Sequence, residues 1–264
     1  VGGHRFEATD EHPIWAAPLT SQEHQRRSLG TAAWVAAKNL SEDSAVYIPK
    51  TTNFDSSPVV ISLRQREFRV GSRNEIPNEL LVDEDVAFWL GAYMGDGGAQ
   101  EKQGVVCITL SRGYKEKHIK RLQEIGSRVF SLPSTVREIG KVLRLTWHST
   151  QLAHALLSEF GSRDEKRIPA AIMRSASKEV CASFLFGWYE TDGSHRQDKT
   201  KPFTITSVSK GGSLDGVALF LRCGVFPALR EEDPTSREGR EHHKLCYKLE
   251  CRNSDLVTLG WPLE

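Results

Sequence analysis

The sequence predicts an α+β fold in which an αββαββ unit occurs twice, preceded by a small β-rich region. Two stretches read alike: "LGAYMGDGG" at 90–98 and "FLFGWYETDGS" at 184–194 each close an apolar run with an acidic residue and a Gly. After each stretch the hydrophobic pattern runs through the same order of strands and helices, which indicates an internal duplication. Residues 1–73 instead carry short stretches typical of strands.

The first copy of the unit begins where helical periodicity starts, at about residue 83. Asp83 or Asp85 can cap a helix that runs through "VAFWLGAYM". The elements expected after it are a strand at 104–111, a helix at 115–126, strands at 134–140 and 141–149, a helix at 150–161 and a loop at 162–172.

The second copy begins with a helix that starts near Ser177 and ends at Asp192. The elements expected after it are a strand at 201–209, a helix at 214–224, strands at 224–232 and 243–253, and a short helical start at 254–260. The two copies cover about 83–176 and about 177–264 of one domain at 80–264. Their duplication predicts a pseudo-two-fold arrangement of two halves.

The N-terminal region at 1–73 forms the first predicted domain, with short strands and turns in "HPIWAA", "AAWVAA" and "SAVYIP". Its basic stretch at 60–73 alternates enough for one or two strands. The segment "NEIPNE" at 74–79 is expected to act as a hinge before the second domain.

The composition is that of a soluble globular protein, with 39% hydrophobic and 26% charged residues and a net charge of +1. No apolar run approaches the roughly 18 residues of a membrane span, and the N-terminus lacks the apolar stretch of a secretory signal. The five cysteines are an odd number without a CxxC pair, which favours reduced thiols and an intracellular location. The His and Cys residues at 242–251 match no usual zinc spacing.

Basic residues gather in three stretches, at 64–73, 111–121 and 195–210. Each stretch could be ordinary solvated surface charge. Three such clusters in a nearly neutral chain suggest contacts with nucleic-acid phosphates.

The repeated stretch carries small residues at helical spacing, Gly91 with Gly95 and Gly187 with Thr191. Residues four apart share one helix face, so these positions let two helix backbones approach closely. The helix ends, with Asp96 and Asp192, would then lie side by side. Two adjacent carboxylates repel each other unless a divalent cation such as Mg²⁺ binds between them, and paired metal ions suit phosphodiester hydrolysis. The alternative is that each Asp-Gly pair merely ends a helix.

These two stretches resemble the paired motifs of LAGLIDADG homing endonucleases, and the αββαββ order is similar to that family's half-domain. The resemblance implies a monomeric endonuclease without an obligatory protein partner, which makes a staggered double-strand break in a long DNA site. It implies Asp96 and Asp192 as the acids that bind Mg²⁺ or Mn²⁺, with the backbone carbonyls of Gly95 and Thr191 as further ligands. A saddle of strands would read double-stranded DNA in the major groove.

The family also places basic residues near the phosphates, and "GSRDEKRIP" makes Lys166 the candidate in the first half. The corresponding stretch of the second half would follow "VTLGWPLE", where this chain ends. We expect Lys201 or Lys248 to substitute there, or one strand to be cut more slowly than the other. Met94 also departs from the motif at a position that Glu190 keeps acidic.

Contacts with DNA are expected from basic residues of both predicted domains. These residues are Arg64, Arg66, Arg69, Arg73, Arg112, Lys115, Arg144, Arg196, Lys199, Lys201 and Lys248.

In the N-terminal region, Thr9-x-x-His12 resembles the TxxH block of intein splicing (Hint) domains, which often carry an inserted LAGLIDADG domain. Splicing needs a Cys or Ser at the first intein residue and a C-terminal His-Asn, whereas this chain begins with Val1 and ends "WPLE". We therefore expect an intein-derived endonuclease with a partial Hint region that contacts DNA. The alternatives are a splicing fragment with a degenerate nuclease, and a maturase or regulator that binds nucleic acid without cleaving it.

Overall fold

The computed structural model describes residues 7–21, 27–48, 57–63, 76–111, 116–194, 202–233, 235 and 244–261. The chain divides into two compact units, one of residues 3–50 and one of residues 1–2 with 51–264.

The smaller unit is a sheet of short strands, with one 3₁₀ turn at Ala37–Asn39. Its strands are β1 (Pro13–Ser21), β2 (Arg27–Leu29), β3 (Ala33–Ala36) and β4 (Ser44–Val46), and β1 pairs antiparallel with the other three. Among its described residues, Ala16 and Ala17 are the buried apolar ones, while Trp34 is 69% exposed. The unit therefore has little core of its own.

The division near residue 50 falls earlier than the expected domain boundary at 73. The reason is the pairing of β5 (Val60–Ser62) with β6 (Glu79–Leu81), which ties the segment around residue 60 to the larger unit. Ile61 in β5 and Leu63 just after it are buried in the core of that unit.

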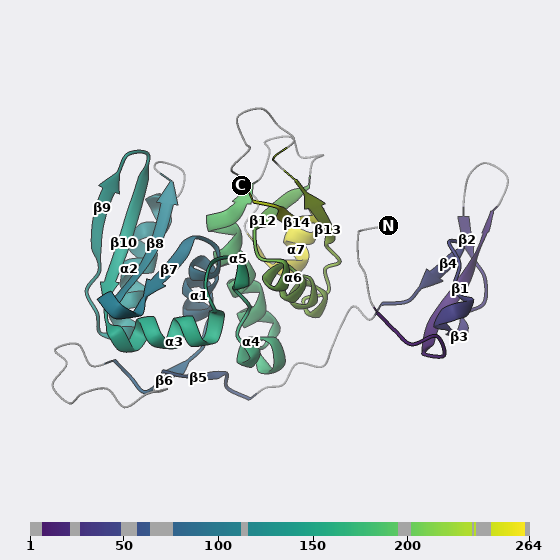
Figure 1. Cartoon of the computed structure of the whole chain (residues 1–264), viewed down its shortest axis with the longest axis horizontal. Coiled ribbons are helices and arrows are strands. Elements are labelled where there is room, and N and C mark those ends of the chain that lie inside the picture. The colour runs from purple at the N-terminus through teal and green to yellow at the C-terminus, as the bar shows by residue number, and fades with distance from the viewer. Residues whose placement is uncertain are drawn as a thin grey trace. The chain divides into compact units, whose positions relative to one another are not determined.

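The larger unit has two halves of similar order (Figure 1). The first half comprises α1 (Glu84–Asp96), β7 (Gly97–Gln100), β8 (Val105–Ser111), α2 (Glu116–Phe130), β9 (Thr135–Ile139), β10 (Val142–His148), α3 (Thr150–Phe160) and α4 (Ala170–Ser175). The second half comprises α5 (Lys178–Asp192), β11 (Gly193–Ser194), β12 (Phe203–Ser207), α6 (Lys210–Arg222), β13 (Ala228–Glu232), β14 (Cys246–Cys251) and α7 (Ser254–Leu259).

The two four-stranded sheets confirm the duplicated α+β fold. Their strand orders are β7-β8-β10-β9 and β11-β12-β14-β13, and all neighbours within each sheet are antiparallel. Gly97 pairs with Ile108 at the start of the first sheet, and Gly193 pairs with Ile205 at the same place in the second. This shared register relates the paired positions of one sheet to those of the other, although the strands of the second sheet are shorter or equal in length.

Several element boundaries differ from those expected. Helix α2 continues four residues past Gly126, because Phe130 at its end is buried in the core. The loop after α3 contains a 3₁₀ turn at Arg163–Glu165 and the short helix α4. Helix α6 begins four residues before Leu214, because Ser209 caps its first turn by accepting a hydrogen bond from the Gly212 amide.

The central helices α1 and α5 lie between the two sheets (Figure 1). Each begins at a side-chain cap, since Asp83 accepts from the Val86 amide and Ser177 from the Val180 amide. Nine residues of α1 and eight of α5 are buried, so both helices are covered on almost every side.

Candidate active site at the seam of α1 and α5

The two central helices cross at a distance that only glycine permits. A Cβ on Gly91 would lie 1.9 Å from the carbonyl oxygen of Phe184, and a Cβ on Gly187 would lie 2.0 Å from that of Phe88. These two contacts are reciprocal, because each glycine faces the carbonyl of the equivalent residue in the other helix. One turn further along, a Cβ on Gly95 would lie 2.1 Å from Oγ1 of Thr191. The small residues of the repeated stretch therefore form the seam between the halves.

Both helices end in the same way, at an Asp followed by Gly. Gly97 and Gly193 are extended, with φ of −83° at each, so left-handed backbone is not the reason for glycine here. A Cβ on Gly97 would lie 2.3 Å from the Tyr93 carbonyl oxygen, and one on Gly193 would lie 2.1 Å from that of Tyr189. Glycine lets the chain turn directly from the helix into the first strand of its sheet.

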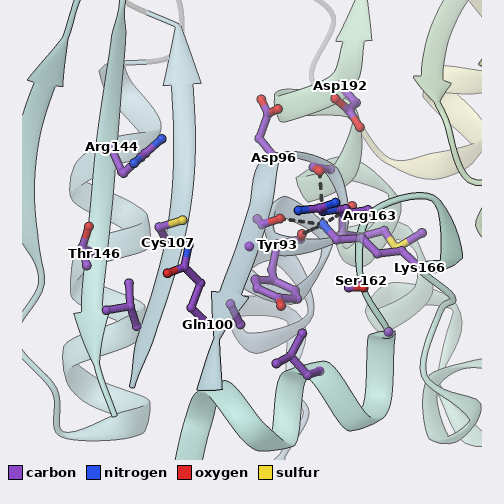
Figure 2. A pocket seen from close by; sticks show the side chains of 18 of the residues that line it. Tyr93, Asp96, Gln100, Cys107, Arg144, Thr146, Ser162, Arg163, Lys166 and Asp192 are labelled. Atoms are coloured by element: carbon purple, nitrogen blue, oxygen red, sulfur yellow. Dashed lines mark hydrogen bonds between the residues drawn. The ribbon is translucent and has the colours of Figure 1, made fainter. Parts of the chain in front are cut away.

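Asp96 and Asp192 line one pocket of about 810 Å³ at these helix ends. Figure 2 shows both side chains at the same end of the pocket, with Lys166 next to them. The indole Nε1 of Trp188 lies 3.4 Å from Oδ2 of Asp192, as a long hydrogen bond that orients this carboxylate. The structure thus brings together the two acids and the lysine that the sequence singled out.

Lys166 is buried against the C-terminal end of α1, with 6% of its surface exposed. Its Nζ lies within hydrogen-bond distance of four carbonyl oxygens, those of Tyr93 at 2.7 Å, Gly97 at 2.8 Å, Met94 at 3.0 Å and Gly95 at 3.3 Å (Figure 2), so its three N–H groups are shared among them. Met94 and Gly95 lie in the last turn of α1, at the negative end of the helix dipole, and the Tyr93 carbonyl also accepts from the Gly97 amide. The lysine therefore caps the helix that carries Asp96.

Burial lowers the pKa of Lys166 to about 8, while the negative charges of Asp192 and Asp96 act in the opposite direction. Both carboxylates are thus close enough to affect the ammonium group. Cys107, a free thiol on the neighbouring strand β8, lines the same pocket. Burial also raises the pKa of Tyr93 well above its ordinary value, so the phenol stays neutral.

The donors at this end of the pocket fit Mg²⁺ better than a softer metal. Within the described ranges, no group of three or more His, Cys, Asp or Glu side chains could hold a metal ion. Mg²⁺ is commonly bound by one or two carboxylates together with waters and substrate phosphates, which matches a site with two Asp side chains. The predicted ligands Gly95 and Thr191 lie one residue before these acids, and the Gly95 carbonyl already accepts from Nζ of Lys166 at 3.3 Å. Metal binding by either carbonyl remains a prediction.

The open face of the first sheet is polar and cationic. Alternate residues of β8 and β10, such as Ile108 and Leu145, point into the core, so the residues between them face the pocket side. The polar side chains on this face of the sheet belong to Gln100, Cys107, Thr109, Thr135, Arg137, Arg144, Thr146 and His148. Arg137 and Arg144 are cross-strand neighbours, and neither makes an ion pair with another residue that the structure describes.

The same face of the second sheet is internally neutralised. Arg230 and Lys248 occupy the register positions of Arg137 and Arg144. Nε of Arg230 lies 2.7 Å from Oε2 of Glu250, and Lys248 forms an ion pair with Glu232. Among the described residues, the open faces of the two sheets therefore carry unequal charge.

Glu190, the acidic residue that Met94 replaces in the first copy, faces the interior of the seam. Its Oε2 lies 2.7 Å from Nε2 of His118 on α2, and both side chains are nearly buried. The two atoms are not aligned as a hydrogen bond, and neither has another hydrogen-bond partner among the described residues. Glu190 thus joins the second motif helix to the first half, a role that sequence spacing did not reveal.

Most of the predicted DNA contacts lie outside the described residues: Arg64, Arg66, Arg69, Arg73, Arg112, Lys115, Arg196, Lys199 and Lys201. Arg144 and Lys248 are described, and they lie on the open faces of the two sheets. In the smaller unit, Thr9 and His12 are exposed, and the His12 amide donates to the Thr9 carbonyl at 2.9 Å in a turn. Of the described helices, none combines the length and the hydropathy needed to cross a membrane.

Comparison with known proteins gives a distant sequence relative and several structures of similar fold. No protein-family model matches the chain. Over 201 residues it is 27% identical to the replication factor C small subunit of Methanocaldococcus jannaschii, which covers 72% of this chain and 10% of that protein. The chain therefore spans about a tenth of the length of this relative.

Among solved structures, a mesophilic variant of the homing endonuclease I-DmoI superposes with a TM-score of 0.49 at 18% identity, covering 67% of this chain and 93% of that one. I-DmoI in complex with DNA and Ca gives the same TM-score and identity and covers 86% of that chain. The N-terminal LAGLIDADG domain of DUF199/WhiA gives a TM-score of 0.45 at 13% identity, covering 67% and 79%. These likenesses are at the level of the fold.

Proposed function

We propose that this chain is a site-specific endonuclease that hydrolyses phosphodiester bonds in both strands of duplex DNA with Mg²⁺. The observation that carries the proposal is the pair of equivalent helix ends at which Asp96 and Asp192 line one pocket beside the buried Lys166. A site that only bound DNA would gain nothing from two carboxylates facing the phosphates, because they repel the backbone. A bound divalent cation removes that repulsion.

In this proposal Asp96 and Asp192 hold Mg²⁺, which would lower the pKa of a bound water and neutralise charge at the phosphate. Lys166 adds a fixed positive charge beside the carboxylates. The open faces of the two sheets follow the major groove on either side of the cleaved bonds, where polar side chains can contact base edges.

The direct test uses a pool of DNA duplexes with a long randomised segment, because the target sequence is unknown. The full chain is incubated with the pool and Mg²⁺, and the newly formed ends are captured and sequenced. We expect one family of sequences to be cut with a short stagger, and EDTA to prevent it. Enrichment of bound sequences without new ends would instead support a binding protein that does not cleave.

We further infer that the chain derives from an intein. The support is the TxxH block before the duplicated unit and the similarity to a short part of a much longer replication protein. A duplex that spans the corresponding uninterrupted sequence of a replication factor C gene is therefore a specific candidate substrate. Cleavage of that duplex, and not of a scrambled one, would support this origin.

The unequal charge of the two sheets predicts unequal contributions to DNA affinity. Replacing Arg144 by Ala should weaken binding roughly 10- to 100-fold, since an arginine contact to a base or phosphate contributes about 1–3 kcal/mol. Replacing Lys248 by Ala should cost about threefold or less, because Glu232 already pairs with this lysine. Both are measured as Kd at fixed salt in EDTA, and equal losses would contradict the assignment.

Lys166 should affect the cleavage rate of one DNA strand more than that of the other, because this lysine belongs to the first half alone. In Lys166→Met we expect about 100-fold slower cleavage of one strand, typical of losing one fixed electrostatic group. Duplexes labelled separately on each strand would then accumulate a nicked intermediate. Equal slowing of both strands would contradict a half-specific role.

A further inference from the structure

The backbone around Lys166 is held from both halves of the molecule: the Arg167 amide donates to the Phe160 carbonyl of its own half at 2.7 Å, and α6 of the second half adds further contacts. Ser209, which precedes α6 of the second half, donates its hydroxyl to the Lys166 carbonyl oxygen at 2.6 Å. The same oxygen of Ser209 accepts the Gly212 amide at 2.9 Å, so one buried hydroxyl both caps α6 and anchors the lysine.

A second contact from α6 fixes the residues that follow Lys166. Asp215 accepts from Arg167 in a bidentate pair at 2.6 and 2.7 Å, and its Oδ2 also accepts the Ile168 amide at 3.1 Å. The Asp215 side chain is 12% exposed and that of Arg167 is 60% exposed, so it is the bidentate geometry and the third hydrogen bond that distinguish this contact from an ordinary surface ion pair.

The first turn of α6 has no side chains where it meets this loop. A Cβ on Gly211 would lie 2.6 Å from Cδ of Arg167, and a Cβ on Gly212 would lie 2.8 Å from the Lys166 carbonyl oxygen. In the "SKGGSLD" stretch at 209–215, the two glycines let α6 approach the Lys166 loop closely. Ser209 and Asp215 in the same stretch then form hydrogen bonds with that loop.

The position of the lysine ammonium depends on these anchors. Between α3 and α4 the loop has one 3₁₀ turn and no other regular structure, and Lys166 ends that turn. Its four carbonyl contacts, at 2.7 to 3.3 Å, would be lost after a backbone shift of about 1 Å. A shift of that size near a reacting group can reduce a rate by about two orders of magnitude.

We propose that Ser209 and Asp215 are positioning residues that hold Lys166 of the first half beside Asp96 and Asp192. The site of the first half is then complete only when α6 of the second half is docked against it. The catalytic consequence rests on the proposed nuclease function, whereas the positioning itself does not.

The positioning is tested without DNA by labelling lysines of the free protein with an amine-reactive reagent and measuring each site by mass spectrometry. Lys166 should react slowly in the unmodified chain and severalfold faster in Ser209→Ala and Asp215→Ala, while the exposed Lys141 keeps its rate. Ser149→Ala is the matched control, since it removes an equivalent helix cap, to the Leu152 amide, that has no contact with Lys166. Unchanged labelling of Lys166 in both α6 variants would overturn the proposal.

The catalytic arm uses kinetics of strand cleavage. Ser209→Ala and Asp215→Ala should each lower kcat for the Lys166-dependent strand by about 10- to 100-fold with KM unchanged. Ser209→Thr, which keeps the hydroxyl, should retain the kcat of the unmodified chain. In the Lys166→Met background, neither variant should cause a further loss, because both act through the lysine. Losses that multiply in that background would overturn the positioning role. If the unmodified chain does not cleave DNA, the proposed function fails, and the labelling result still decides the positioning.

Discussion

Replacing Asp96 by Asn is expected to reduce cleavage of both DNA strands by about 10³-fold or more, the upper end for removal of one electrostatic group. The amide keeps the shape of the carboxylate and one neutral oxygen, but it loses the negative charge that attracts Mg²⁺. Asp192→Asn should behave in the same way, because both acids line one pocket at equivalent helix ends. The measurement is single-turnover cleavage at saturating enzyme.

DNA binding should survive these changes, and in EDTA it should become tighter. Each Asp→Asn change removes one negative charge that faces the phosphates, so Kd should fall by severalfold at low salt. Asp85→Asn is the matched control at the opposite end of α1, where the carboxylate pairs with Arg121 and Arg128. It should leave cleavage nearly unchanged. Undiminished cleavage in either Asp96→Asn or Asp192→Asn would exclude the metal-binding role.

The two acids are not held alike, which adds a finer expectation. Trp188 orients Asp192, whereas Ala92 occupies the equivalent position in the first half. The first half therefore has no indole at the position from which Trp188 contacts Asp192. A crystal structure with Mn²⁺ and a nicked duplex would reveal whether one metal position is better ordered.

The duplicated fold and the pairing of the motif helices could be predicted because they follow from local patterns. Small residues four apart define a helix face, and a repeated order of elements places that face twice. Asp83 as a helix cap also follows from a short stretch of sequence. These features depend on spacing within one element or on similarity between the halves, whereas Lys166 near the acids is implied only by the resemblance to LAGLIDADG endonucleases.

Other features depend on contacts between distant segments, which no local pattern encodes. Ser209 and Asp215 read as ordinary residues at the start of a helix, and only the packed halves bring them to the Lys166 loop. The pairing of Lys248 with Glu232 likewise requires the register of β13 and β14. Lys248 was predicted as a DNA contact from its charge alone, without its competing carboxylate.

The seam itself makes the second strong prediction: Gly91→Ala should destabilise the larger unit by about 3 kcal/mol. In an open helix the same change would stabilise by about 1 kcal/mol, so the sign is diagnostic. The added methyl would lie 1.9 Å from the Phe184 carbonyl oxygen, and α1 and α5 must separate to admit it. For a unit of this size the melting temperature should fall by roughly 6–12 °C.

Gly187→Ala should have a similar effect, because its methyl would lie 2.0 Å from the Phe88 carbonyl oxygen. The double variant should lose less than the sum of the two, since a single separation of the helices relieves both contacts. Gly98→Ala is the control, since its methyl would meet only the Cys107 sulfur at an ordinary 3.7 Å. Asp96 and Asp192 lie at the ends of α1 and α5. When the added methyl pushes these helices apart, the rate of DNA cleavage by the protein that remains folded should therefore also fall. Stabilisation by Gly91→Ala, or full additivity with Gly187→Ala, would mean that the seam is looser than its contacts indicate.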